Sequence, residues 1–204
     1  MLSEREKMLK GMMYNPDDTE LKNMRLNAHR YSKQFNDITE DEVEKRAEIL
    51  KKLCPRVGEG TYISGPVFFD YGFFTSFGKN CFVNFNLTVL DCCSVKIGDD
   101  VFIGPNVTIA APMHPLLAKE RNRNINGEIS EYAKPVEIGD NCWIGANVVI
   151  CGGVKIGNNC VIGAGSVVTK DIPDGMLAAG NPCISLRQIT DEDSVKLRPE
   201  LWED

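Results

Sequence analysis

The sequence lacks long apolar runs. None approaches the roughly 18 residues that a membrane-spanning helix needs, and the charged start MLSEREK lacks the apolar segment of a signal peptide. It also lacks any block of Lys and Arg, and the net charge of −6 is spread along the chain. We therefore expect a cytoplasmic protein whose main partner is neither a membrane nor a nucleic acid.

Metal-binding patterns are absent as well. The chain has eight cysteines but no CxxC pair, and only two histidines that could share a metal site. Neither a P-loop nor a dinucleotide-binding glycine pattern occurs. We expect no metal, and we interpret most cysteines as small apolar core residues.

Helix signals fill residues 1–54. Capping patterns occur at Ser3 and Thr39, and Asp17 or Asp18 can start a middle helix. Proline at position 55 should end the segment after Cys54. We therefore divide the chain into a helical segment (1–54), a repeat domain (55–187) and an acidic tail (188–204).

The middle of the chain repeats every six residues, with an aliphatic or aromatic residue often followed by glycine. The repeat positions are Tyr71, Phe77, Val83, Val89, Ile97, Ile103, Ile109, Ile138, Ile144, Ile150, Ile156, Ile162 and Val168. Such a hexad suits a short strand and a tight corner, and three strands would close a coil of about 18 residues around an aliphatic column. Cys81, Cys142 and Cys160 fall in the small apolar slot of the hexad. The pattern predicts a mainly β solenoid rather than a sandwich of ordinary strands.

One stretch, IAAPMHPLLAKERNRNINGEISEYAKP, interrupts the repeat between about residues 114 and 135. A solenoid tolerates such an insertion on one face. His114 would then stand where a rigid wall meets an extruded loop.

The segment IGDNCWIGANVVICGGVKIGNNCVIGAGSVVTKDIP resembles the hexapeptide-repeat acyltransferases, whose fold is a left-handed parallel β-helix. The helical start, DYG at 70–72, NFNLTVLD at 84–91, MHP at 113–115 and AAGNPC at 178–183 resemble the maltose and galactoside O-acetyltransferases. The resemblance covers about residues 3–187. It implies transfer of an acetyl group from acetyl-CoA to a sugar hydroxyl by a homotrimer with active sites between subunits.

Imidazole titrates near neutral pH, so His114 suits a general base, although a turn histidine would look the same in the sequence. The resemblance implies that His114 is the catalytic base and that Asn84 lies at the reacting centre. An asparagine at a left-handed corner is the alternative for Asn84. His29 has no matching motif, and we expect it to be structural or exposed to solvent.

The resemblance also implies residues for the acceptor and for the cofactor. Those for the acceptor are Asp17, Arg25, Asp70, Asn84, Cys92 and Glu131, with helix capping or solvated charge as the alternative for Asp17, Arg25 and Asp70. Those for acetyl-CoA are Gly104, Trp143, Ala146, Ala164, Thr169, Lys170 and Arg187, with subunit packing as the alternative for Trp143.

Three departures concern the acceptor and the cofactor. Ile184 stands where many relatives have Arg, Cys92 replaces an acidic residue of the galactoside type, and the loop after His114 is longer. Two other functions stay open: an acetyltransferase for an antibiotic or another alcohol or amine, and a β-helix without catalysis that serves as an assembly module.

Overall fold

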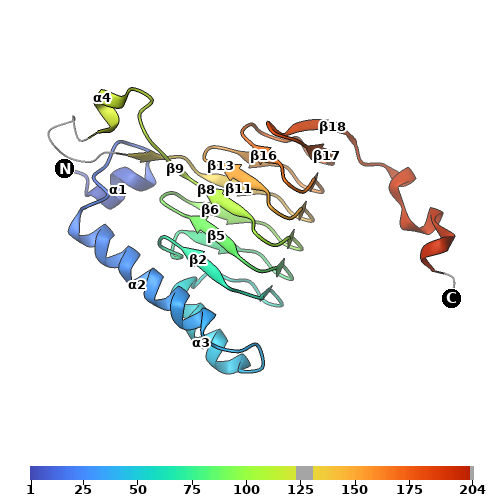
Figure 1. Ribbon diagram of the computed structural model, residues 1–204, viewed down its shortest axis with the longest axis horizontal. Coiled ribbons are helices and arrows are strands. Elements are labelled where there is room, and N and C mark those ends of the chain that lie inside the picture. The colour runs from blue at the N-terminus through green and yellow to red at the C-terminus, as the bar shows by residue number, and fades with distance from the viewer. Residues whose placement is uncertain (123–130, 203–204) are drawn as a thin grey trace.

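A computed structural model describes residues 1–122 and 131–202, and within it the chain winds into a parallel β-helix (Figure 1). Three sheets form its sides, and the chain passes from the seven-stranded to the five-stranded to the four-stranded sheet in each coil. The seven-stranded sheet contains β1 (Tyr62–Ile63), β4 (Phe82–Val83), β7 (Phe102–Ile103), β12 (Trp143–Ile144), β15 (Val161–Ile162), β17 (Met176–Ala179) and β18 (Ile184–Gln188). The five-stranded sheet contains β2 (Val67–Phe69), β5 (Leu87–Leu90), β8 (Thr108–Ala110), β13 (Val149–Cys151) and β16 (Val167–Val168). The four-stranded sheet contains β3 (Thr75–Phe77), β6 (Val95–Ile97), β11 (Val136–Ile138) and β14 (Lys155–Ile156).

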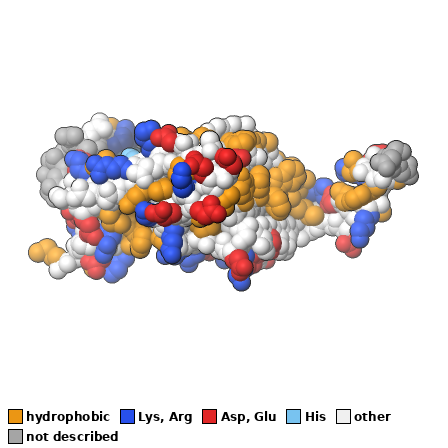
Figure 2. Space-filling view, turned by 90° about the horizontal axis from the view of Figure 1, so that it is seen from below, with side chains coloured by type: hydrophobic (Ala, Val, Ile, Leu, Met, Phe, Trp, Pro, Cys, Tyr) orange, Lys and Arg blue, Asp and Glu red, His pale blue; other side chains and the backbone are white. Residues whose placement is uncertain are grey.

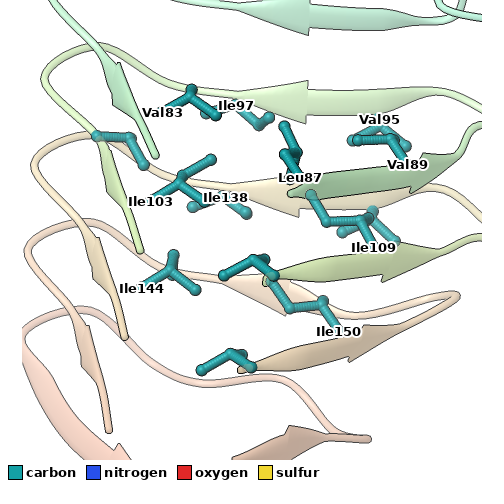
Figure 3. Close-up of a cluster of buried hydrophobic side chains, with 14 of the residues drawn as sticks. Val83, Leu87, Val89, Val95, Ile97, Ile103, Ile109, Ile138, Ile144 and Ile150 are labelled. Carbon is teal, nitrogen blue, oxygen red and sulfur yellow. The ribbon is translucent and has the colours of Figure 1, made fainter. Parts of the chain in front are cut away.

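The repeat positions of the hexads form the core of the coil. Figure 3 shows aliphatic side chains from successive coils meeting inside the prism, among them Val83, Ile103 and Ile144. Cys81, Cys142 and Cys160 are buried in the same cluster as free thiols. The predicted solenoid and the packing role of these three cysteines are therefore confirmed.

The corners of the coil depend on residues that accept a positive φ. Asparagine and aspartate occupy this conformation at Asn80, Asn86, Asp100, Asn106, Asn141, Asn147 and Asn159. Their short polar side chains tolerate the left-handed region better than other non-glycine residues do. Asparagine and aspartate at these positions therefore favour the sharp turns that connect the short strands.

The N-terminal segment forms α1 (Glu4–Leu9), α2 (Thr19–Asn36) and α3 (Val43–Leu53), which lie at one end and along one side of the coil (Figure 1). Ser3 makes the predicted capping box, and Asp18 caps α2. The predicted cap at Thr39 is wrong, because α3 begins at Val43 after an N-cap at Glu42 that makes no side-chain cap bond. The end of α3 before Cys54 is as predicted.

The outer faces of the prism differ in chemistry. Tyr62, Phe82, Phe102 and Trp143 lie side by side in register on the seven-stranded sheet and are exposed. The four-stranded sheet instead carries Lys96, Glu137 and Lys155 in register. Hydrophobic side chains also gather on part of the molecular face in Figure 2. An exposed aromatic row of this kind is typical of a surface that contacts a ligand or another chain.

The interruption of the repeat forms an antiparallel pair, β9 (Pro112–Met113) with β10 (Tyr132–Ala133), and a short helix α4 (Ala118–Arg121). The rest of the expected loop, residues 123–130, lies outside the described residues. The tail has three 3₁₀ helices, at Asp191–Asp193, Val195–Leu197 and Pro199–Leu201, and extends away from the coil (Figure 1). Within the described ranges, every helix is too short or too polar to cross a bilayer. The division into three regions at residues 54 and 187 stays a prediction.

Candidate active site

The candidate residues lie on two edges of the prism. The five–four edge, where the five-stranded sheet turns into the four-stranded one, carries Asp70 after β2, Cys92 after β5 and His114 after β8 and β9. The seven–five edge carries Asn84 after β4. Because coils stack in register, residues far apart in sequence become neighbours along one edge.

His114 projects from the root of the extruded loop and is half exposed. Its Nε2 lies 3.7 Å from Oε2 of Glu131, whose side chain is 13% exposed. The hydroxyl of Tyr14 donates to the other carboxylate oxygen, Oε1. Tyr14 and Glu131 also exchange two backbone hydrogen bonds, of 2.9 and 3.2 Å. The carboxylate is therefore held from the N-terminal segment and faces the imidazole.

Asp70 and Cys92 lie next to each other on the five–four edge. The thiol of Cys92 donates to Oδ2 of Asp70 at 3.5 Å, and Oδ1 of Asp70 lies 3.8 Å from Nε2 of His29. Burial, reinforced by the charge of Asp70, raises the pKa of the Cys92 thiol above its ordinary value. Cys92 is thus a buried neutral donor that orients Asp70, with little surface of its own to offer a sugar.

Arg25 comes from α2 and faces the same region. Its Nη1 donates to the hydroxyl of Tyr71 at 3.1 Å and to the carbonyl of Pro16 at 3.2 Å. Of the two aspartates that precede α2, Asp18 is the helix cap, since it accepts from two backbone amides. Asp17 is exposed, and its carboxylate is left for a ligand or solvent.

Asp91 is a structural residue that the sequence did not reveal. Its buried carboxylate accepts hydrogen bonds from the backbone amides of Tyr71, Gly72 and Phe74 and from the hydroxyl of Thr75. Burial raises its pKa to about 6, although these hydrogen bonds oppose the shift. The bonds fix the turn that follows Asp70 and contains Tyr71. Asp91 therefore helps to hold Asp70 in its position in the candidate site.

Asn84 is not a left-handed corner residue, since Asn86 holds that position in its turn. Oδ1 of Asn84 accepts from the backbone amide of Phe85 at 2.8 Å, and its amide NH₂ group has no hydrogen-bond partner among residues 1–122 and 131–202. Asn84 and His114 stand at opposite ends of the five-stranded sheet. Asn84 precedes β5, whereas His114 follows β8 in the next coil. The length of a strand and the step between two coils therefore separate them, roughly 15 Å at the rise of an extended chain. The chain therefore does not bring these two residues together within one subunit.

The expected acetyl-CoA residues lie on the two edges and on the seven-stranded sheet. Gly104, Ala146 and Ala164 stack along the seven–five edge, where a Cβ at Gly104 would lie 2.8 Å from the backbone nitrogen of Ala146. Thr169 and Lys170 follow β16 on the five–four edge and are exposed. Trp143 points outward from the seven-stranded sheet.

Arg187 has a partner already. Its guanidinium donates to both carboxylate oxygens of Asp193, at 2.5 and 2.7 Å. This ion pair lowers the pKa of Asp193 to about 2. A phosphate that approached Arg187 would compete with the tail. Among the described residues, no cluster of His, Cys, Asp and Glu has the composition of a metal site.

The fold and the candidate site can now be compared with those of known protein families. Residues 7–58 match the maltose acetyltransferase hexapeptide capping motif, and residues 135–170 match the bacterial transferase hexapeptide repeats. A further succinyl-transferase hexapeptide repeat matches residues 94–112. The chain belongs to the hexapeptide-repeat acyltransferases of the maltose and galactoside O-acetyltransferase type.

Individual relatives agree over nearly the whole chain. A galactoside O-acetyltransferase of Escherichia coli is 44% identical over 92% of this chain and 90% of its own length. The crystal structure of a maltose O-acetyltransferase from Clostridium difficile 630 superposes with a TM-score of 0.88 at 43% identity, covering 93% and 99% of the two chains. A galactoside acetyltransferase in complex with coenzyme A gives the same TM-score at 41% identity, covering 95% and 94%.

Proposed function

We propose that this protein transfers the acetyl group of acetyl-CoA to a hydroxyl of a sugar related to maltose, glucose or a galactoside. The observation that carries the proposal is the contact between His114 and Glu131, 3.7 Å apart. Glu131 and Asp70 both lie near Cys92, and Arg25 lies near Asp70. A base held by a carboxylate, next to groups that bind hydroxyls, suits the activation of an alcohol. The named activities of the relatives support the same acceptor class.

His114 acts as the general base. A neutral imidazole accepts the proton of the acceptor hydroxyl as its oxygen attacks the carbonyl carbon, and it returns that proton to the departing sulfur. When bound, acetyl-CoA supplies the thioester to which this carbonyl carbon and this sulfur belong. Glu131 faces the imidazole that becomes positive, so its charge stabilises the protonated base.

Asn84 supplies a neutral donor at the reacting centre. With Oδ1 bound to the amide of Phe85, the free NH₂ group can donate to the oxygen that becomes negative during transfer. Asp17, Arg25, Asp70 and Glu131 line the acceptor side in this assignment.

The residues present fit the proposed cofactor in part. Small residues on the seven–five edge let an extended chain approach the backbone, and Trp143 offers an exposed apolar face beside them. Lys170 is an exposed cation for a phosphate. Arg187 would have to leave Asp193 first, and Ile184 is exposed and offers no charge.

We further propose a homotrimer in which each active site lies between two subunits. The support is the division of the site: His114 is on one edge of the prism, and Asn84 is on another. A head-to-tail ring places one edge of a chain against the other edge of its neighbour. We place the protein in the cytoplasm, since its eight cysteines are all free thiols.

An acceptor screen tests the proposed function. Release of free thiol from acetyl-CoA is followed with monosaccharides, disaccharides, amines and antibiotics as acceptors. We expect release with a sugar to exceed release with every amine or antibiotic by at least about tenfold in kcat/KM. A preference for a non-sugar would overturn the acceptor assignment, and no release with any acceptor would support an assembly module.

Glu131→Gln separates two roles of this carboxylate. If it stabilises the protonated His114, its loss should lower kcat by about 10- to 100-fold, because a charge-assisted contact contributes about 1.5–3 kcal/mol. Tyr14→Phe keeps the charge and removes only its hydroxyl donor, so we expect a smaller loss of several-fold. Steady-state kcat and KM for the acceptor provide the measurement. A rise in the acceptor KM alone would mean that Glu131 only binds the sugar.

A further inference from the structure

Asp91 follows β5 at the five–four edge, and its carboxylate is completely buried. Its Oδ1 accepts from the backbone amides of Tyr71 and Gly72 at 2.8 and 3.1 Å. Its Oδ2 accepts from the amide of Phe74 at 3.2 Å and from the hydroxyl of Thr75 at 3.0 Å. Four donors of the turn between β2 and β3 thus converge on one carboxylate, and none of the roles assigned above has this carboxylate touch a substrate.

The turn depends on this carboxylate. Its three bonded amides belong to buried residues, and a buried amide without an acceptor costs about as much free energy as a lost hydrogen bond. The turn also has little room to take another shape. Gly72 has a φ of +67°, and a Cβ at this position would lie 2.2 Å from the carbonyl oxygen of Leu53 at the end of α3. Loss of a bond to Asp91 should therefore loosen the turn rather than let it find another stable form.

This turn connects Asp91 to the acceptor side of the candidate site. Asp70 comes directly before the turn, and the hydroxyl of Tyr71 accepts from Nη1 of Arg25 at 3.1 Å. Asp70 and Arg25 are both assigned to the acceptor, so their positions depend on a carboxylate that lies behind them. The contact that holds the base has a different anchor, since Glu131 is held by the hydroxyl of Tyr14. A movement of the turn should therefore affect binding of the sugar more than it affects the base.

The hydrogen bonds of Asp91 require its ionised form. An ionised carboxylate only accepts hydrogen bonds, whereas a protonated one carries a donor on one oxygen. All four groups that face Asp91 are donors, so an added proton would face another donor and at least one bond would be lost. Burial raises the pKa of Asp91 to about 6, which brings this protonation to just below neutral pH.

The other ionisable groups packed around Asp91 are thiols and a phenol. Burial raises the pKa of Cys54, at the end of α3, to about 12, and the charge of Asp91 adds to this shift. Burial also raises the pKa values of Tyr71, Cys92 and Cys93 above their ordinary values, so all four groups stay neutral near pH 6. The charged side chains that act on these groups are those of Arg25, Arg56, Asp70 and Glu131.

We propose that Asp91 is a positioning residue for the acceptor: its ionised carboxylate holds the turn that orders Asp70 and Arg25, and its protonation loosens the turn and weakens sugar binding. This rests on the proposed function and adds a pH dependence that belongs to the sugar and not to acetyl-CoA. The direction follows from the raised pKa of Asp91. Above a pH of about 6 the carboxylate is ionised and the turn is held, and sugar affinity falls as the pH drops through this value.

The test measures KM for glucose, maltose and methyl galactoside, and KM for acetyl-CoA, from about pH 5 to about pH 8. For the wild type we expect the sugar KM to be about tenfold higher at the acid end, as loss of one hydrogen bond to a charged group predicts. The KM for acetyl-CoA should stay within about twofold over the same range, because none of its expected residues lies in the turn.

Thr75→Val assigns the pH effect to Asp91, because it removes one donor to this carboxylate and keeps the β-branched shape. A carboxylate that loses a donor is protonated more readily, so the midpoint of the change in sugar KM should move upward by about one pH unit. Thr88→Val is the matched control. It makes the same change on the outer face of β5, beside Thr108 of β8, and should keep the wild-type profile. Titration of His29, which lies 3.8 Å from Asp70, would not respond to either variant.

Asp91→Asn removes the charge at nearly constant shape. Its sugar KM should be about tenfold above that of the wild type at about pH 8 and nearly constant down to about pH 5. The dissociation constant of methyl galactoside, measured by ligand-observed NMR in His114→Ala, should follow the wild-type profile, since this variant has no base that could titrate.

The possible outcomes separate this proposal from the proposed function. A wild-type sugar KM that does not change with pH, or a midpoint that Thr75→Val leaves in place, would overturn the role of Asp91 while sugar acetylation stands. A sugar that binds with the expected pH profile but never reacts would instead count against the proposed function. Sugars that neither bind nor react would overturn both.

Discussion

Acetyl transfer by His114→Ala should be about 10³- to 10⁴-fold slower than by the wild type, with the fold intact. Alanine leaves no group that can accept the proton of the acceptor hydroxyl, and the half-exposed imidazole lies outside the buried core. Initial rates of thiol release at saturating acetyl-CoA and sugar give the measurement. Thermal unfolding should occur within a few degrees of the wild type.

His29→Ala is the matched control, because His29 is the other histidine and also lies beside a carboxylate, at 3.8 Å from Asp70. With a methyl glycoside as acceptor, we expect at most a several-fold loss. A His114→Ala enzyme that kept more than about a tenth of the wild-type rate would rule out His114 as the base.

The coil could be predicted because its determinants are local. Each hexad carries its own inward aliphatic residue and its own corner, so Ile144 or Asn147 finds its place from neighbours in sequence. The same locality explains the success at Ser3 and Asp18, whose caps bond amides two or three residues away. The prediction of a cap at Thr39 was wrong, because a capping pattern permits a cap without requiring one. The turn before α3 places Glu42 at the N-cap instead.

The candidate site was predicted residue by residue but not as a network. Tyr14 and Glu131 are 117 positions apart, and no local pattern records that their backbones pair. Asp91 shows the same limit, since its hydrogen bonds reach back by 16 to 20 positions, one coil earlier. The resemblance implied that Arg187 binds acetyl-CoA, and the sequence could not reveal that Asp193 of the tail pairs with it. Contacts between coils and between distant segments thus became visible only in the folded structure.

The separation of Asn84 from His114 gives the most direct test of the assembly. Asn84→Ala should lower the rate by about 100- to 1,000-fold, as loss of a donor at a developing negative charge does. If the two residues act across a subunit boundary, neither variant alone can form an intact site. A trimer that contains both variants can, because an intact His114 then meets an intact Asn84 on the neighbouring chain.

Equal amounts of His114→Ala and Asn84→Ala chains, unfolded together and refolded, should therefore regain about a quarter of the wild-type rate. Random assembly makes about three quarters of the trimers mixed, and each mixed trimer has one intact site of about three. Variants refolded separately and then mixed form the control, and should stay inactive if subunits do not exchange. Light scattering of the refolded sample tests the trimeric mass. If each chain contained a whole active site, the mixture would be as inactive as its parents, and the site would have to close within one subunit across the five-stranded sheet.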